Sequence, residues 1–168
     1  VYDKDDSCPD LAGVIEKDGC PITDRDEDGV NDEGDACPDE PGNIKNSGCP
    51  DNPLSIMSII ENAQILFKFN GDQPIQESDS FLSDLSELLK KYSYVNLDIK
   101  GYASNEGPAE YNQILSERRS GNVKATLESM GIESNRLMVI GEGENNSPFP
   151  NNTKENRSKN RTVLISIK

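Results

Sequence analysis

The stretch Val95-Asn96-Leu97-Asp98-Ile99-Lys100-Gly101 decides the fold of this chain. Its apolar residues alternate with polar ones, and this period of two is typical of a strand that buries one face. A helix is expected to follow, since Pro108 suits the first turn of a helix and Gly131 suits a position just beyond its end. A strand that leads into a long helix indicates a domain in which helices pack on a sheet.

Periodic segments on both sides predict the remaining elements. They are strands over residues 63–69, 136–140 and 162–167, and an amphipathic helix over residues 81–92 with Ser78 or Ser80 near its N-cap. Residues 54–61 fit either a short helix or a linker. The order β-α-β-α-β-β predicts an α+β fold, a two-layer α/β sandwich whose helices cover one face of a mixed sheet.

The composition excludes several classes of protein. The chain has 168 residues and a formal net charge of −14, which argues against nucleic-acid binding because such proteins need a basic surface. There is no histidine and no tryptophan, so histidine-based triads and zinc sites of the zincin type, which need histidine ligands, are excluded. No apolar run reaches the roughly 18 residues of a membrane-spanning helix. Because the chain begins with Val1, we expect a processed fragment without its signal peptide.

Charge is distributed unevenly along the chain. Residues 1–53 hold 16 acidic and 4 basic residues, whereas residues 54–168 hold 15 and 13. The composition changes near Pro50-Asp51-Asn52-Pro53, and the first part has too few apolar residues to build a core of its own. We therefore expect an irregular, cross-linked segment over 1–53 and a globular domain over 54–168.

The first part contains an internal repeat with a period of 29 residues, in which 9 of 16 aligned positions are identical. Each copy holds two cysteines 12 positions apart. Four cysteines allow three pairings, and the repeat favours the local one, Cys8 with Cys20 and Cys37 with Cys49. Such disulfides imply an oxidising compartment. The alternative is a zinc site, which the spacing and the many carboxylates disfavour.

Between the two cysteine pairs lies a carboxylate-rich stretch that fits a calcium loop. Asp24, Asp26 and Asp28 occupy its positions 1, 3 and 5, Gly29 the sharp turn at position 6, Val30 a carbonyl ligand at position 7, and Asp32 and Asp35 positions 9 and 12. Alternate residues of such a loop direct oxygens at one centre, as a hard ion with six to eight ligands needs. The alternative is a solvated acidic linker.

This pattern, with its spaced Gly-Cys-Pro triplets, resembles thrombospondin type 3 repeats, in which the chain wraps around calcium ions in place of a hydrophobic core. The resemblance implies bound Ca²⁺ and a longer calcium array, of which Asp3 and Asp6 are half a site. Asp10, Asp39 and Asp51 are either additional ligands or solvated.

One charged residue lies on an apolar helical stripe. Leu115, Arg119, Val123 and Leu127 are spaced four apart, so the arginine faces the core or the edge of a cleft. A buried guanidinium needs acceptors or an anionic ligand. It pairs either with such a ligand or with an internal carboxylate such as Asp98, while its neighbour Arg118 points away from the stripe.

Four motifs carry a second resemblance. They are Gly101-Tyr102-Ala103-Ser104-Asn105-Glu106-Gly107, Tyr111 to Arg119, Val139 to Glu144 and Asn160 to Val163. Over about residues 60–168 the chain resembles the C-terminal domain of the OmpA family. With a calcium-repeat segment before it, the resemblance implies the periplasmic part of a Gram-negative outer-membrane protein with an upstream β-barrel, as in Bacteroidetes-type bacteria.

The resemblance also implies non-covalent binding of peptidoglycan through the diaminopimelate of its stem peptide. The family arginine that takes the ligand's carboxylate is Arg119, and Asn112 and Arg161 match the helix asparagine and the Asn-Arg pair. The family's acid, which takes the ammonium, is replaced by Ser104. Either Glu106 supplies the missing charge, or the site prefers another stem residue, binds weakly or has lost its ligand.

These features predict a binding module that anchors the outer membrane to the cell wall on a calcium-stiffened, disulfide-linked segment. The alternative is a structural or adhesion protein whose domain binds protein partners or forms a homodimer. An enzyme is not expected, because the candidate carboxylates Glu142 and Glu144 lack any activating motif. The polar loop 141–160 either shapes a wall of the site or is a mobile surface loop.

Overall fold

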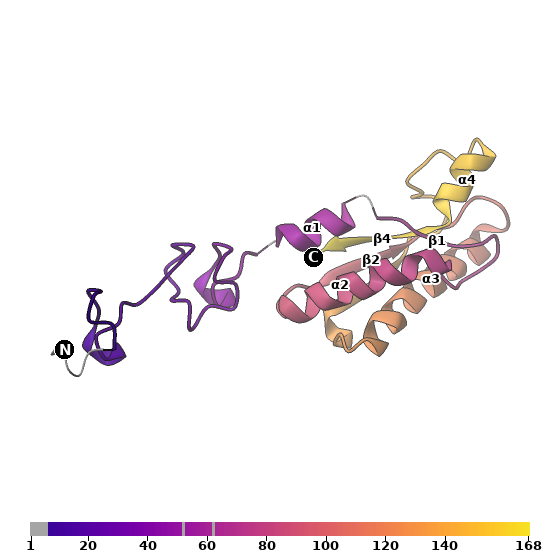
Figure 1. The fold of residues 1–168 in the computed structure, drawn as a ribbon. Helices are drawn as coiled ribbons and strands as arrows, with labels where there is room; N and C mark the ends of the chain where they lie inside the picture. Colours follow the sequence, from indigo (N-terminus) through magenta and orange to yellow (C-terminus); the bar gives the residue numbers. More distant parts are fainter. Residues whose placement is uncertain (1–6, 52, 62) are drawn as a thin grey trace. The chain divides into compact units, whose positions relative to one another are not determined.

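The structure is a computed structural model that describes residues 7–51, 53–61 and 63–168. The chain divides into two compact units, Val1–Pro53 and Leu54–Lys168 (Figure 1). Among the residues described, no helix is both long enough and apolar enough to cross a membrane.

The second unit is a four-stranded mixed sheet covered by helices. Its elements are α1 (Leu54–Ile60), β1 (Ile65–Leu66), α2 (Asp79–Lys91), β2 (Leu97–Gly101), α3 (Ala109–Ser129), β3 (Leu137–Gly141), α4 (Lys154–Asn160) and β4 (Thr162–Ile167). The strand order is β1-β4-β2-β3. Strand β2 runs parallel to β3 and antiparallel to β4, which in turn is antiparallel to β1. The predicted α+β fold with a mixed sheet is confirmed.

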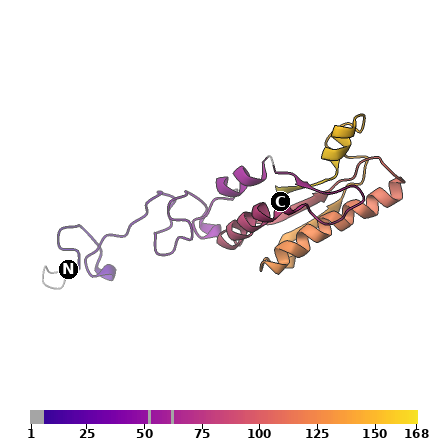
Figure 2. The same cartoon turned by 45° about the vertical axis from the view of Figure 1, so that its right-hand side comes forward.

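The two long helices α2 and α3 lie along one face of this sheet (Figures 1 and 2). The alternation in β2 explains why, since Leu97 and Ile99 are fully buried while Asp98 and Lys100 are only half-buried. Helix α3 packs on β2 and β3 and buries Val123 completely. The result is the two-layer arrangement that the sequence predicts.

Three local features differ from the expectation or complete it. The first strand is shorter than residues 63–69, because a turn closed by the bond from Gly71 N to Lys68 O leads the chain away and leaves Phe69 60% exposed. Ser78 precedes α2, but its side chain makes no capping hydrogen bond. Residues 54–60 form a helix, and the polar loop after β3 contains the unpredicted helix α4.

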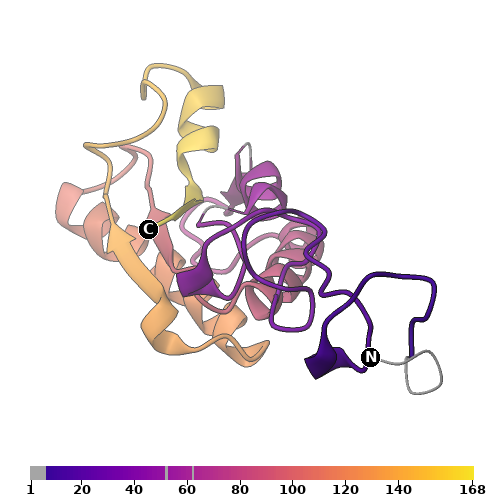
Figure 3. The same cartoon turned by 90° about the vertical axis from the view of Figure 1, so that its left-hand side faces the viewer.

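The first unit has little regular structure in its described part. Two 3₁₀-helices, Ile15–Lys17 and Ile44–Asn46, occupy equivalent positions of the repeat (Figure 3). The disulfides Cys8–Cys20 and Cys37–Cys49 form as predicted. Each copy also has the same 3.0 Å backbone bond across its loop, from Val14 N to Cys20 O and from Asn43 N to Cys49 O. The sequence repeat is therefore also a structural repeat.

Candidate functional site

The site of the second unit begins where β2 ends. At Gly101 the strand approaches α3 so closely that an added Cβ would lie 2.0 Å from the carbonyl oxygen of Ser116. Only glycine permits this contact. The loop after β2 is thereby held close to the middle of α3, where Arg119 lies.

Arg119 is completely buried and is held by backbone oxygens. Its Nε donates to Gly71 O at 3.0 Å, Nη1 to Tyr102 O at 2.9 Å and Nη2 to Lys68 O at 3.3 Å. The ring of Phe67 stacks beneath the guanidinium, 5.1 Å from its carbon to the ring centroid. The arginine thus joins α3 to the segment after β1 and to the loop after β2.

The partners of Arg119 are carbonyls, so the alternative of an ion pair with Asp98 is wrong. In the described part of the chain, Asp98 Oδ1 is buried without a hydrogen-bond partner. Burial, and secondly the nearby charge of Arg161, lower the pKa of Arg119 from its usual range to about 10. The group stays charged at neutral pH. Three of its five N–H donors are used in these bonds, which leaves two for a ligand.

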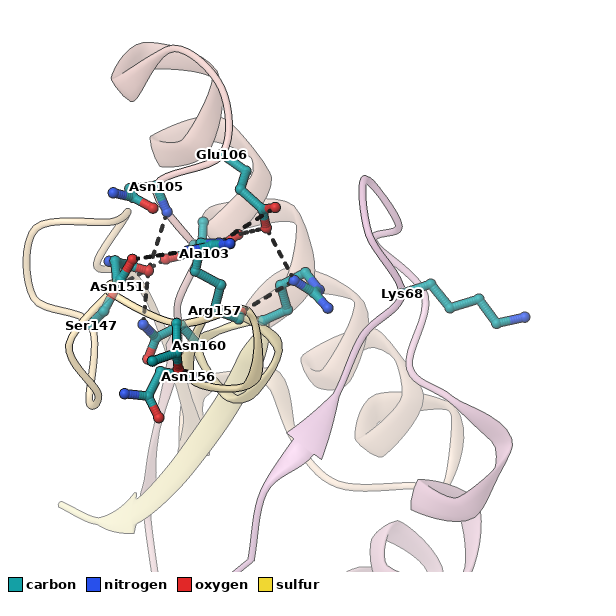
Figure 4. Close-up of polar contacts among 12 residues, drawn as sticks. Lys68, Ala103, Asn105, Glu106, Ser147, Asn151, Asn156, Arg157 and Asn160 are labelled. Carbon is teal, nitrogen blue, oxygen red and sulfur yellow. Dashed lines mark hydrogen bonds and ion pairs between the residues drawn. The ribbon is translucent and has the colours of Figure 1, made fainter.

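The position of the expected acid is occupied by Ser104, which is buried. Its Oγ donates to Glu106 Oε2 at 3.1 Å. The same carboxylate contacts two guanidinium groups, Arg161 through Nη1 at 3.3 Å and Arg157 through Nε at 3.5 Å. Figure 4 shows Glu106 above Arg157 with these contacts as dashed lines. Glu106 therefore does turn back toward Ser104.

The loop between β3 and β4 forms part of this neighbourhood. The side-chain oxygen of Asn151 accepts from the backbone N–H of Asn105 at 3.3 Å and from Asn160 Nδ2 at 2.9 Å (Figure 4). Asn160 is fully buried and also bonds to the backbone of Phe149. These contacts favour the expectation that the loop shapes one wall of the site.

A narrow cleft brings all five predicted ligand-binding residues together. It is lined by Ser104, Glu106, Asn112, Arg119 and Arg161, and also by Phe69, Asn70, Ala103 and Leu115. Asn112 is buried and donates to Gly107 O at 3.4 Å and to the carboxylate of Glu144. The cleft has about 10 Å³ of free volume, room for about one water, so it must widen to admit a ligand carboxylate.

Arg157 belongs to this cluster, although no motif identified it. It lies in α4, four residues before Arg161, which follows the end of that helix, and both side chains contact Glu106. The sequence could have indicated this role for Arg157 only if α4 had been predicted.

In the first unit, three of the predicted calcium ligands converge. Carboxylate oxygens of Asp24, Asp26 and Asp28 lie within 4.8 Å of one another. The loop turns at Gly29, whose φ is 92°, and Gly29 N donates to Asp24 Oδ2 at 3.0 Å. One oxygen each of Asp24, Asp26 and Asp35 is buried without a partner in the described part of the chain. Such oxygens fit a hard cation.

The remaining acids of this segment are arranged differently. Asp32 accepts from the backbone N and from Nε of Arg25, at 3.0 and 3.2 Å, so it faces a cation instead of the carboxylate cluster. Asp39 pairs with Arg25 Nη1 at 2.8 Å, Asp51 accepts from Asn46, and Asp10 is exposed. Asp3 and Asp6 lie outside the described residues.

The pKa values of Asp26, in the carboxylate cluster, and of Asp32, beside Arg25, are shifted in opposite directions. Burial and the neighbouring charges of Asp28, Asp35 and Asp24 raise the pKa of Asp26 above its usual 3.8. Hydrogen bonding from Thr23, followed by contacts with Arg25, lowers that of Asp32.

The fold of the second unit is that of a small α+β domain found in known proteins. The crystal structure of the peptidoglycan-associated lipoprotein from Burkholderia pseudomallei superposes with a TM-score of 0.65 at 18% identity, over 70% of this chain and all of that one. Outer membrane protein A from Bordetella avium is 33% identical over 65% of this chain and 56% of its own length. The peptidoglycan-associated lipoprotein of Buchnera aphidicola is 32% identical over 60% of this chain and 58% of its own.

The family model described as "OmpA family" matches residues 66–161. The chain therefore belongs to the OmpA family. It covers less than 60% of the length of either relative, so their whole activities do not transfer directly.

Proposed function

We propose that residues 54–168 form a non-covalent peptidoglycan-binding module of an outer-membrane protein, which ties that membrane to the cell wall from the periplasmic side. The observation that carries this proposal is the convergence of Ser104, Glu106, Asn112, Arg119 and Arg161 on one cleft. Two relatives named above are called peptidoglycan-associated, and neither is named as an enzyme.

The chemistry of the cleft suits a carboxylate of the stem peptide. Arg119 has two N–H donors beyond those bound to carbonyls, and a guanidinium binds carboxylates through paired hydrogen bonds. Its other bonds hold the group in place before the ligand arrives, which lowers the entropic cost of binding. In this proposal the diaminopimelate residue of the stem peptide enters beside Ser104 and Asn112.

Calorimetric titration with a diaminopimelate-containing stem peptide tests this function. We expect binding that is lost in Arg119→Lys, because an ammonium cannot reproduce the planar fork of donors. The variant's circular dichroism and unfolding midpoint must show that it is folded under the assay conditions. Absence of binding to the wild-type protein at millimolar peptide would overturn the proposal.

The first unit is proposed to be a calcium-stiffened segment of the thrombospondin type 3 kind. Asp24, Asp26 and Asp28, together with Asp35, would hold the ion, and the Val30 carbonyl would complete the loop. The support is the three buried carboxylate oxygens that lack partners in the described residues. Calcium would offset the repulsion among these carboxylates and so order a segment that has no hydrophobic core.

A second candidate function is a structural or adhesion protein with weak or lost peptidoglycan binding. The complete burial of Arg119 and the replacement of the family acid by Ser104 favour it. Analytical ultracentrifugation with and without the peptide separates the two. A stable homodimer that does not bind the peptide would favour this candidate. A monomer that binds the peptide would favour the first.

A further inference from the structure

Glu106, the residue expected to bind the ligand's ammonium group, already contacts two cations. Its Oε1 lies 3.5 Å from Arg157 Nε, and its Oε2 lies 3.3 Å from Arg161 Nη1. The Glu106 side chain is 37% exposed and that of Arg161 only 16%, so these charges are partly removed from water. An ammonium group that approached this carboxylate would meet two positive charges at close range.

The two arginines also have donors that are not used. Nε of Arg161 is buried and makes no hydrogen bond in the described part of the chain, and Nε of Arg157, also buried, has only the long 3.5 Å contact with Glu106 Oε1. Arg161 uses only Nη1, toward Glu106 and toward the carbonyl oxygen of Arg157 at 3.2 Å. Arg157 donates from Nη1 to Asn151 O, also at 3.2 Å. Buried guanidinium donors without acceptors are unfavourable, and a carboxylate would satisfy them.

Arg119 adds a third positive charge to the same place. Arg119 and Arg161 both line the cleft, and among the described lining residues Glu106 is the one carboxylate. The other nearby acid, Glu144, accepts a hydrogen bond from Asn112 and does not line the cleft. The two positive charges that line the cleft, together with that of Arg157 beside it, therefore exceed the single negative charge of Glu106.

We propose that the cleft recognises its ligand through two carboxylates, and that the ammonium contributes little. Arg119 takes one carboxylate, and Arg157 with Arg161 forms a second carboxylate subsite. Glu106 is the internal carboxylate that the ligand's second carboxylate replaces. This inference rests on the proposed function and deepens it, because it assigns the site a preference for stem peptides whose carboxylates are free instead of amidated.

Three versions of one ligand test this preference by calorimetry. They are the tripeptide L-Ala–D-Glu–meso-diaminopimelate, the same peptide acetylated at the free amino group of diaminopimelate, and the same peptide with its carboxylates amidated. We expect acetylation to change Kd by less than about threefold and amidation to weaken binding at least about tenfold. A larger loss on acetylation than on amidation would overturn the inference.

Variants give predictions of opposite sign for the two roles of Glu106. If Glu106 competes with the ligand, Glu106→Gln tightens binding of the unmodified peptide about threefold or more. If it binds the ammonium, the same change weakens binding, and the inference is wrong. Arg157→Gln is expected to weaken binding about tenfold. The matched control is Lys154→Gln, an exposed cation at the start of the same helix, which should leave Kd unchanged.

Different results contradict the proposed function and the second carboxylate subsite. A wild-type protein that binds no version of the peptide contradicts the proposed function and, with it, this inference. A wild-type protein whose binding depends on Arg119 but weakens in Glu106→Gln keeps the proposed function and refutes only the second carboxylate subsite.

Discussion

The Nη1 atom of Arg119 lies 2.9 Å from the carbonyl oxygen of Tyr102, and this hydrogen bond fixes α3 to the loop that follows β2. Because the same guanidinium also binds the carbonyls of Lys68 and Gly71, one side chain connects three segments around the cleft. The residue proposed to bind the ligand is thus also part of the structure that shapes the site. Its variants must be assayed for both roles.

The first prediction concerns stability. Arg119→Ala removes the hydrogen bonds to the buried carbonyl oxygen of Tyr102 and to the less buried ones of Lys68 and Gly71. We expect it to lower the free energy of unfolding of the second unit by about 3 kcal/mol. The control is Arg118→Ala, which removes an exposed side chain and should change it by less than about 0.5 kcal/mol. Urea unfolding followed by circular dichroism measures both. Similar values for the two variants would contradict the assigned contacts.

The second prediction concerns the cell wall itself. We expect the wild-type protein and Arg118→Ala to sediment equally with purified peptidoglycan and Arg119→Lys to stay in the supernatant, because Arg119 lines the cleft and Arg118 does not. Lysine retains the charge, so the comparison isolates the paired donor geometry. Equal loss for Arg118→Ala would show that non-specific charge, and not the cleft, retains the protein.

The third prediction concerns metal removal. Chelation of calcium is expected to increase amide hydrogen exchange over residues 7–51 and to leave exchange over residues 63–168 unchanged. Among the described residues, the buried apolar side chains other than Cys37 and Cys49 all lie in the second unit. Unfolding of the second unit on chelation would contradict the prediction that calcium stabilises only the first unit.

A pair of variants tests the ligand set of the same site. Asp26→Asn removes a carboxylate of the cluster and should weaken calcium binding at least about tenfold. Asp10→Asn removes an exposed carboxylate outside the cluster and serves as the control. Equal effects would mean that the acidic segment attracts calcium only through its total charge.

The fourth prediction concerns the disulfides. All four cysteines lie in the first unit and pair within it, so a reducing agent should loosen that unit alone. Each loop is short, and the loss is expected to be about 3 kcal/mol per disulfide against the unfolded chain. Amide hydrogen exchange of the first unit, measured with and without reductant, reports this loss of stability. A lowered unfolding midpoint of the second unit in reductant would show that the stability of the two units is coupled.

The periodic parts of the sequence predicted the fold well. The stretch from Val95 to Gly101 alternates because one face of β2 lies under α3, and period-two burial is visible in sequence. Strand β4 was predicted with its observed bounds for the same reason. By contrast, Phe69 continues the apolar alternation of β1 yet is exposed, since a turn and not side-chain periodicity decides where that strand ends.

The site was only partly predictable, for a physical reason. The helical spacing of Leu115, Arg119 and Val123 correctly indicated a buried arginine, but no pattern indicates that its acceptors are carbonyls 48 and 51 residues away. Likewise, Arg157, which contacts Glu106, lies in the short polar helix α4, and the sequence of this helix has no apolar stripe from which it could be predicted. Contacts between loops depend on tertiary structure, which local sequence does not encode.

The last prediction uses Arg136 as an internal reference for Arg119. Arg136 is also nearly buried, and its guanidinium donates to the carbonyls of Leu89, Tyr92 and Val95 at 2.7–2.9 Å, away from the cleft. Arg136→Lys and Arg119→Lys should therefore lower the free energy of unfolding by similar amounts, on the order of 2 kcal/mol.

Peptide binding per folded molecule should separate this pair. Arg136→Lys is expected to keep the wild-type Kd, because none of the contacts of Arg136 lies in the cleft. Arg119→Lys is expected to bind the peptide at least about tenfold more weakly. Calorimetry performed well below both unfolding midpoints makes the comparison fair. If both variants bind as the wild type does, Arg119 is a structural arginine like Arg136, and the structural or adhesion role becomes the better account of the domain.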